Sequence, residues 1–236
     1  MSILMNPLLR LMETSKFHYL LASLTLMIVS YPFIEGRGFA EHLFLFINLA
    51  IFFSSLYMFD HSRRLRLFAY INGGIMLLFG VLSSFMPVLP QVLELIFAVS
   101  TLSFFIFLAM AIIADFLHTT EVTVDTISGA ACVYLLIGVI WSLAYALVEH
   151  IDPGSFHFTA PKKAIHLTNT SSFSYFSFVT LTTVGFGDII PISKGAKLLV
   201  IIEAILGQFY IAIFLARIIA SYQGKKKSLP PSKGNT

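Results

Sequence analysis

The stretch "TLTTVGFGDIIP", residues 181–192, separates the last two apolar runs of the chain. It sets two glycines two residues apart, between hydroxyl side chains and an aspartate. Gly185 and Gly187 are poorly suited to the interior of a transmembrane helix, and Pro191 ends any helix begun there. The stretch is therefore expected to be non-helical, and the rest of the chain decides what such backbone can do.

The composition identifies lipid as the solvent of this chain. Of its 236 residues, 57% are hydrophobic and only 11% are charged, whereas roughly a quarter of the residues in a soluble domain are charged. The net charge of +3 is too small to indicate binding to nucleic acid. The single cysteine, Cys132, excludes an intramolecular disulfide and multi-cysteine metal sites, and its apolar surroundings favour a packing role.

Six segments approach the roughly 20 apolar residues that a membrane-spanning helix needs. Because an open sheet leaves backbone groups unpaired in lipid, we predict an all-α membrane protein with six transmembrane helices. Residues 1–16 lack a long apolar core and are expected to form a cytoplasmic or interfacial N-terminus, without a cleavable signal peptide. The six expected helices are 17–34, 41–59, 66–86, 92–117, 127–148 and 195–222.

The distribution of lysine and arginine predicts the orientation. With the N-terminus on the cytoplasmic side of a cell membrane, nine cationic residues lie inside and five lie outside. The segment 149–194 then faces outward, and its first part, residues 149–170, is expected to be a polar surface loop. The C-terminal residues 223–236 then form a basic cytoplasmic tail. Its lysines either contact anionic lipids or are an ordinary solvated flank: Lys225, Lys226 and Lys227.

A short helix is predicted directly before the glycines. The segment "SSFSYFSFVTLT", residues 171–182, is too short to span and is expected to be re-entrant, with Thr170, Ser171 and Ser172 as candidates for its N-cap. Its partially negative C-terminal end would point to the middle of the membrane, where it stabilises a cation. Non-helical backbone at that depth must be buried in protein or line a water-filled path. There Gly185 and Gly187 are expected to adopt backbone angles forbidden to other residues, which lets successive carbonyl oxygens turn toward one axis.

The seven residues "TTVGFGD", 182–188, resemble the signature sequence of potassium channels, with Phe186 where tyrosine is common. The resemblance covers residues 127–222 and implies an outer helix, a pore helix 171–182, a filter 183–187 and an inner helix. It also implies a homotetramer that conducts K⁺ passively, with no enzymatic activity and no cofactor besides the permeant ion. The implied K⁺ ligands are carbonyls of Thr183, Val184, Gly185 and Phe186, and Gly187 completes the filter.

Two departures from the family pattern limit the comparison. Phe186 lacks the phenol that hydrogen-bonds to pore-helix aromatics in many relatives, although Tyr175 and Phe176 are expected to pack around the filter. Asp188 matches the acidic residue that supports the filter, but Val179 replaces a glutamate that pairs with it in some relatives. Two alternatives stay open: a weakly selective monovalent cation channel, and a non-conducting membrane sensor or subunit.

The last apolar segment carries further candidates. Glu203 is an ionisable group inside a predicted span, which makes it a functional hypothesis by default. We expect it to support the filter through a pore-helix hydroxyl, with Ser174, Ser177 and Thr180 in range. Gly207 lies where relatives carry a glycine hinge, but close helix packing explains it equally well. Two residues beyond it are candidates for the cavity below the filter: Gln208 and Ile211.

Residues 17–117 are predicted to be a peripheral four-helix domain without a voltage sensor. A sensor needs several arginines or lysines within a span, and residues 92–117 contain none. Conventional voltage gating is therefore not expected. Arg217, near the inner end of the last span, is expected to reach lipid headgroups. No nucleotide-binding motif is present, so a small-molecule substrate is not expected.

Overall fold

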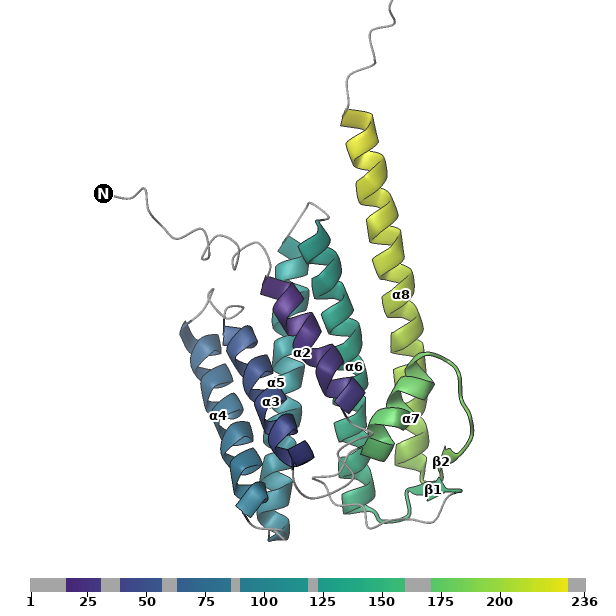
Figure 1. The fold of residues 1–236 in the computed structure, drawn as a ribbon. Coiled ribbons are helices and arrows are strands. Elements are labelled where there is room, and N and C mark those ends of the chain that lie inside the picture. The colour runs from purple at the N-terminus through teal and green to yellow at the C-terminus, as the bar shows by residue number, and fades with distance from the viewer. Residues whose placement is uncertain are drawn as a thin grey trace, which may run out of the picture.

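The computed structural model describes residues 16–30, 39–56, 63–85, 90–118, 123–159 and 171–228. The N-terminal residues 1–15, the N-cap candidate Thr170 and residues 229–236 of the predicted tail lie outside them. Figure 1 shows long helices side by side, with a short helix and a small ribbon at one end. In chain order the elements are α2 (Lys16–Ser30), α3 (Phe39–Leu56), α4 (Arg63–Phe85), α5 (Gln91–His118), α6 (Val124–Ile151), β1 (Phe156–Phe158), α7 (Ser171–Leu181), β2 (Ile189–Pro191) and α8 (Lys194–Ser228).

Helices occur at all six positions where the sequence predicts a span. Within the described ranges, three of them are long and apolar enough to cross a membrane: Val92–Phe116, Val124–Ile151 and Lys194–Ala220. The apolar helices Phe17–Ser30, Phe46–Ser55 and Leu67–Leu82 are shorter. The structure is therefore that of a helical membrane protein, while a count of six spans stays a prediction.

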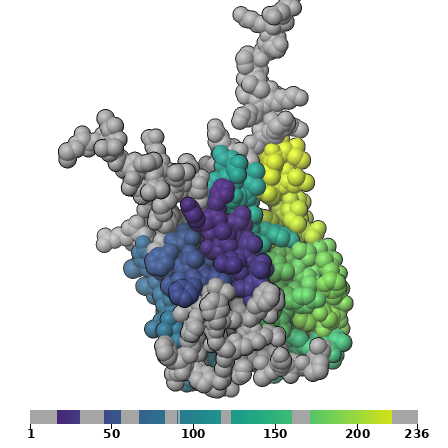
Figure 2. Space-filling view, in the orientation of Figure 1, coloured from purple at the N-terminus to yellow at the C-terminus, as the bar shows by residue number. Residues whose placement is uncertain are grey.

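α8 is longer than the predicted inner helix 195–222. Its 35 residues correspond to about 52 Å at 1.5 Å per residue, which exceeds the hydrocarbon thickness of a bilayer. The start of the predicted basic tail, including Lys225, Lys226 and Lys227, is thus helical, although the placement of these lysine side chains lies outside the description. The helix continues six residues beyond the predicted end at 222, to Ser228. Figure 2 shows the part of α8 coloured yellow along one edge of the molecule.

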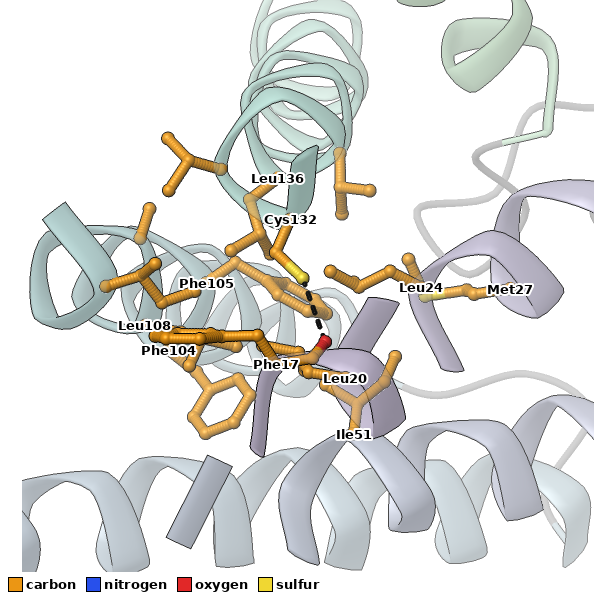
Figure 3. Close-up of a cluster of buried hydrophobic side chains, with 14 of the residues drawn as sticks. Phe17, Leu20, Leu24, Met27, Ile51, Phe104, Phe105, Leu108, Cys132 and Leu136 are labelled. Carbon is orange, nitrogen blue, oxygen red and sulfur yellow. Dashed lines mark hydrogen bonds between the residues drawn. The ribbon is translucent and has the colours of Figure 1, made fainter. Parts of the chain in front are cut away.

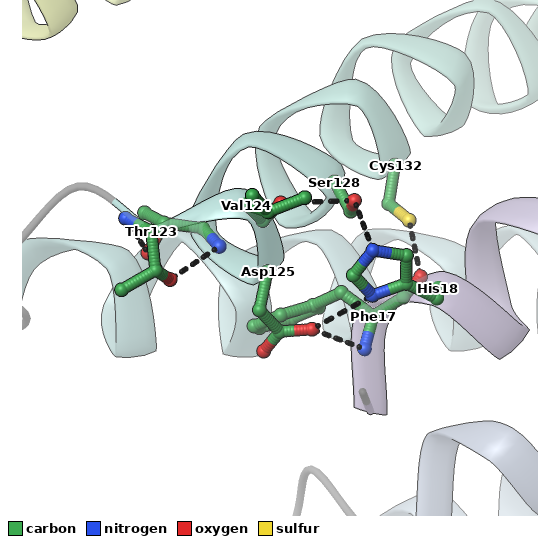
Figure 4. Close-up of polar contacts among 8 residues, drawn as sticks. Phe17, His18, Thr123, Val124, Asp125, Ser128 and Cys132 are labelled. Atoms are coloured by element: carbon green, nitrogen blue, oxygen red, sulfur yellow. Dashed lines mark hydrogen bonds and ion pairs between the residues drawn. The ribbon is translucent and has the colours of Figure 1, made fainter. Parts of the chain in front are cut away.

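The start of α6 is fixed by local chemistry (Figure 4). Thr123 is the N-cap, and it forms a capping box in which its hydroxyl accepts from Thr126 N and the Thr126 hydroxyl accepts from Thr123 N. In the same turn, the Asp125 carboxylate accepts from Phe17 N at 3.2 Å and lies 3.3 Å from His18 Nδ1. The first turn of α6 therefore also holds the start of α2.

The helices α2 to α5 pack as a bundle against α6 of the same chain. Figure 3 shows the apolar centre of this packing, to which α2, α3, α5 and α6 all contribute. Cys132 is fully buried there, and its thiol lies 3.6 Å from Phe17 O, which confirms the expected packing role. The helices α2 and α5 thus contact α6 of their own chain directly. The labelled members are Phe17, Leu20, Leu24, Met27, Ile51, Phe104, Phe105, Leu108, Cys132 and Leu136.

A two-stranded antiparallel ribbon departs from the expectation of helices and loops alone. β1 pairs with β2, with Phe156 opposite Pro191 and Phe158 opposite Ile189. Each strand has three residues, too short for a period-2 pattern to appear in the sequence. The stretch from residue 149 onward was expected to be a polar surface loop, but its described part buries Phe156 and pairs with the chain that follows the glycines.

Candidate functional site

The short helix α7 is held against α6 by one buried face. Its buried residues are Phe173, Ser174, Phe176, Ser177 and Leu181. The rings of Phe173 and Phe176 lie 5.1 Å and 5.6 Å from the ring of Phe156, which is on β1. The Ser174 hydroxyl lies 2.8 Å from that of Ser142 on α6. The helix thus extends over 171–181, close to the predicted 171–182, with aromatic packing on one side.

The two aromatics predicted to pack around the glycine segment lie on different sides of α7. Phe176 is buried, with its ring 5.2 Å from that of Tyr145 on α6. Tyr175 is exposed on the other side, and its ring stacks on Phe186 with the centroids 6.3 Å apart and the planes 2° from parallel. Within one chain, Tyr175 contacts the glycine segment directly, whereas Phe176 packs α7 against α6.

The backbone that follows α7 turns back on itself. The carbonyl oxygen of Val179 accepts from Val184 N at 2.9 Å and lies 3.3 Å from Gly185 N, so one carbonyl holds two successive N–H groups. The φ angles of Thr183, Gly185 and Gly187 are +62°, +56° and +77°. Every second residue is therefore left-handed. Gly185 and Gly187 were expected to adopt such angles, whereas Thr183 is the only non-glycine residue with positive φ among those described.

This alternation has a consequence for the peptide groups. When residues of opposite hand alternate, successive N–H groups gather on one side of the chain, and the carbonyl oxygens gather on the other. The side chains along the segment are open to solvent in a single chain, with Val184 and Phe186 exposed by 54% and 69%. The segment is therefore non-helical, alternates in hand and is left uncovered by the rest of its own chain.

The end of the segment is fastened by the ribbon. Thr159 N donates to Asp188 O at 2.9 Å, and β2 begins at the next residue. After β2, Ile192 N and Ser193 N both donate to Ser155 O, at 2.7 Å and 3.2 Å. Main-chain bonds thus hold both ends of the segment, at Val179 before it and at the ribbon after it.

Glu149 is a site residue that the sequence reasoning missed. It lies near the end of α6, is buried, and accepts from Gly154 N at 3.1 Å and from Phe156 N at 3.0 Å. These bonds shape the turn that leads into β1. An available signal was an acidic residue just before "DPG", residues 152–154, because such a turn presents main-chain N–H groups that need an acceptor.

Asp188 has a partner in the same chain. Its carboxylate accepts a hydrogen bond from the phenol of Tyr175 and another, at 3.1 Å, from Ile189 N. Desolvation, followed by the bond to Asp188 and the charge of that carboxylate, raises the pKa of the Tyr175 phenol. The sequence reasoning considered only Val179 as the position facing Asp188. Tyr175 instead contacts both Phe186 and Asp188.

Glu203 on α8 is completely buried, with an exposed fraction of 0%. One of its carboxylate oxygens accepts from the hydroxyl of Ser177 on α7, and the other accepts from the phenol of Tyr145 on α6. The Ser177 hydroxyl also lies 2.8 Å from Gly138 O. Ser177 is one of the three hydroxyls that the sequence suggested, whereas Tyr145 was not anticipated.

Of the other candidates on α8, Gly207 lies on the buried side of the helix, whereas Gln208 and Ile211 lie on its exposed side. Gly207 is buried against the end of α7, where a Cβ atom in its place would lie 2.6 Å from Leu181 Cδ1 and 3.3 Å from Leu181 O. This contact supports the packing explanation for Gly207. Gln208 and Ile211 are exposed in the single chain, away from that contact.

Arg217 does not behave as expected for a side chain that reaches lipid headgroups. Its guanidinium lies 3.8 Å from the centre of the Phe116 ring and donates to Phe116 O at 2.6 Å. The last turn of α5 offers unpaired carbonyl oxygens, and a guanidinium is well placed to satisfy one of them. Arg217 therefore joins α8 to the end of α5.

Comparison with known proteins agrees with this architecture over its second half. Residues 131–223 match the family model described as "Ion channel", a range that includes most of α6, all of α7, the glycine segment and most of α8. The chain matches no curated protein and no solved structure. The match supports an ion channel, and the apolar helices indicate that it lies in a membrane.

Proposed function

We propose that the protein is a potassium-selective channel whose pore is formed by four identical chains. Residues Thr183 to Gly187 form the selectivity filter, and carbonyl oxygens of Thr183, Val184, Gly185 and Phe186 bind K⁺. Conduction is passive and involves no chemical reaction. The observation that carries the proposal is the left-handed backbone at every second residue of the segment, Thr183, Gly185 and Gly187.

In this mechanism the filter replaces water around the ion. Removing the hydration shell of K⁺ costs free energy, which coordination by converging carbonyl oxygens offsets, and repulsion between ions at adjacent positions speeds their exit. The C-terminal end of α7 carries a partial negative charge, which stabilises an ion in the cavity below the filter. Gln208 and Ile211 are proposed to line that cavity.

The exposure of α8 supports assembly into a tetramer. One filter segment forms one wall of a pore, so a closed ring of oxygens needs several copies around one axis. Within a single chain only 11% of the apolar window of α8 is buried. Neighbouring chains would cover part of this helix and the exposed ring of Phe186, and lipid would cover the rest.

The proposal extends to placement and regulation. Both termini lie on the cytoplasmic side of the cell membrane, and anionic lipids there are contacted by Lys225, Lys226 and Lys227. Conventional voltage gating is not part of the proposal, because Val92–Phe116 contains no lysine or arginine. The first four helices act as a peripheral support for the outer helix.

Planar-bilayer recording from the purified protein, under bi-ionic K⁺ and Na⁺ conditions, tests the proposal. A reversal potential strongly displaced toward the K⁺ equilibrium value supports it, together with a fourfold assembly by native mass spectrometry. A reversal potential near zero indicates the weakly selective cation channel. Absence of both current and rubidium uptake into liposomes, across voltage, pH and membrane tension, indicates a non-conducting sensor or subunit.

A further inference from the structure

Two contacts join α8 to α7, and they are spaced alike on both helices. The first is polar, between the Glu203 carboxylate and the Ser177 hydroxyl. The second is apolar, where Gly207 lets α8 approach Leu181 so closely that a Cβ would meet Leu181 Cδ1 at 2.6 Å. Residues four apart lie on the same face of a helix, one turn from each other. The two helices therefore meet at two successive turns, in one register.

The same part of α7 is held by α6 as well. The Ser177 hydroxyl lies 2.8 Å from Gly138 O, and a Cβ at Gly138 would lie 2.6 Å from the Phe178 ring. The Tyr145 phenol reaches Glu203 from the same helix. Glu203 therefore closes a three-helix junction among α6, α7 and α8.

Stability alone does not explain a carboxylate at this junction. Burying a carboxyl group is costly unless it is hydrogen-bonded, and an apolar side chain of similar volume often serves a core equally well. What a carboxylate adds is direction, because its two oxygens accept from two hydroxyls on different helices. Such a contact fixes the position of α7 along the axis of α8.

The position of α7 is transmitted directly to the filter. Leu181 is the last residue of α7 and lies two residues before Thr183. The Val179 carbonyl, inside α7, accepts from Val184 N and Gly185 N. A shift of α7 along α8 would therefore move the filter backbone, because the first filter peptides are bonded to the helix itself.

We propose that Glu203 and Gly207 are positioning residues for ion selectivity. They hold the end of α7 at one depth against α8, and thereby set the spacing of the filter carbonyls. The inference rests on the proposed channel function. It assigns Gly207 to the α7 contact and not to a hinge in the inner helix.

The first test removes the polar contact. Bi-ionic recordings compare the wild type with Glu203→Ala, Ser177→Ala, Tyr145→Phe and Glu203→Gln. Glu203→Ala is expected to lower the K⁺/Na⁺ permeability ratio about tenfold, the change that corresponds to one or two net hydrogen bonds of ordinary strength. Ser177→Ala and Tyr145→Phe lower it less. Glu203→Gln retains selectivity within about threefold, because an amide both donates and accepts.

The matched control is Glu94→Ala. Glu94 is also a buried carboxyl group in an apolar helix, but it lies on α5, outside the junction. The control is expected to leave the permeability ratio unchanged. If Glu203→Ala prevents assembly, the Ser177→Ala variant decides, because it removes the hydroxyl on α7 that bonds to Glu203 and leaves Glu203 itself in place. Wild-type selectivity in an intact Ser177→Ala tetramer, and in Glu203→Ala where that variant assembles, overturns the inference.

The second test uses the apolar contact. Gly207→Ala adds a methyl group that collides with Leu181, so it should lower the permeability ratio. Adding Leu181→Ala removes the colliding atom and should restore the ratio at least in part. A Gly207→Ala variant that changes open probability at unchanged selectivity, with no rescue by Leu181→Ala, identifies a hinge and overturns this assignment.

Failure of the inference and failure of the proposed function are distinguishable. A wild-type protein without K⁺-selective current overturns the proposed function, whatever the variants do. A selective wild type whose selectivity survives the loss of both contacts overturns only the positioning role of Glu203 and Gly207.

Discussion

The helices α5 and α8 are similarly long and apolar, yet they differ greatly in how they are covered. Of the apolar window of each, 44% is buried in α5 and 11% in α8. α5 packs between α4 and α6, whereas α8 contacts its chain mainly through α6, α7 and the ribbon. Hydropathy therefore identifies both as membrane helices. Only the packing shows that α5 is covered on several sides by its own chain, whereas most of the surface of α8 is left uncovered.

The two regions also differ in how deeply they bury polar groups between helices. The bundle of α2 to α5 with α6 packs around apolar residues such as Leu108 and Cys132. Its hydrogen bonds between side chains of different helices, such as that of Ser103 to Asn72, are only partly buried. The region of α6, α7 and α8 has fully buried side-chain hydrogen bonds between helices, at Ser142, Tyr145 and Ser177. Apolar packing tolerates changes in detail, whereas directional bonds specify one arrangement. The second region is therefore expected to control selectivity and the first to control stability.

The largest effect is expected for Gly185→Ala. Its φ of +56° costs a residue with a side chain about 1–2 kcal/mol in each chain, and four chains share one filter in the proposed channel. Rubidium uptake into liposomes should fall about 1,000-fold or more, because the lower bound of the summed cost is about 4 kcal/mol and each 1.36 kcal/mol is about tenfold in rate. Tetramers should still form, because a Cβ at this position meets no atom of its own chain within 4 Å.

Gly154→Ala is the matched control for this substitution. Gly154 also has a positive φ, +93°, and also has no atom within 4 Å of an added Cβ, but it lies in the turn before β1. The same kind of strain should leave rubidium uptake nearly unchanged. Equal loss of uptake in both variants would contradict a special role for Gly185.

Leu108→Ala tests the other side of the comparison. Leu108 is fully buried in the bundle, and its truncation should destabilise each chain by about 2 kcal/mol, the lower end of values for such core cavities. Thermal unfolding in detergent measures the loss. The K⁺/Na⁺ permeability ratio of the remaining folded channels should equal that of the wild type. A changed ratio would show that the bundle, too, sets selectivity.

Glu149→Gln is expected to have an intermediate effect, confined to the ribbon. An amide oxygen replaces only one of the two acceptors for Gly154 N and Phe156 N, which costs about 1–3 kcal/mol for the unsatisfied donor. Hydrogen exchange should accelerate at those two amides. The exposed residue Asp152 provides the control, since Asp152→Asn should leave exchange there almost unchanged. Accelerated exchange throughout α6 would instead indicate a general loss of stability.

The smallest effect is expected for Tyr175→Phe, and it depends on pH. Because the folded-state pKa of Tyr175 is raised, the folded protein keeps the phenol proton to a higher pH than the unfolded chain. The stabilisation is therefore fully present below the ordinary tyrosine pKa of about 10 and is lost as the pH rises beyond it. Melting curves from pH 8 to 11 should show the wild type converging on the variant at high pH. Parallel curves would argue against the bond to Asp188.

Much of the local structure was predictable because it depends on neighbouring residues. The apolar runs located the helices, and the paired glycines in "TTVGFGD" predicted backbone angles that φ values of +56° and +77° bear out. The ribbon was not predictable, because three-residue strands have no pattern and their pairing joins residues more than thirty positions apart. The contact of Arg217 with Phe116 was missed for the same reason, since it joins two helices about a hundred residues apart.

By itself, the sequence determined the solvent, the positions of the helices and the stretch where helical structure must stop. These follow from the free energy of placing each residue in lipid and from the backbone freedom of glycine, which are properties of short segments. Only the tertiary structure decided which side chains meet: Tyr175 with Asp188, Glu203 with Ser177 and Tyr145, and Gly207 with Leu181. Those pairings depend on the depth and rotation of each helix against its neighbours, which close packing sets across the whole chain.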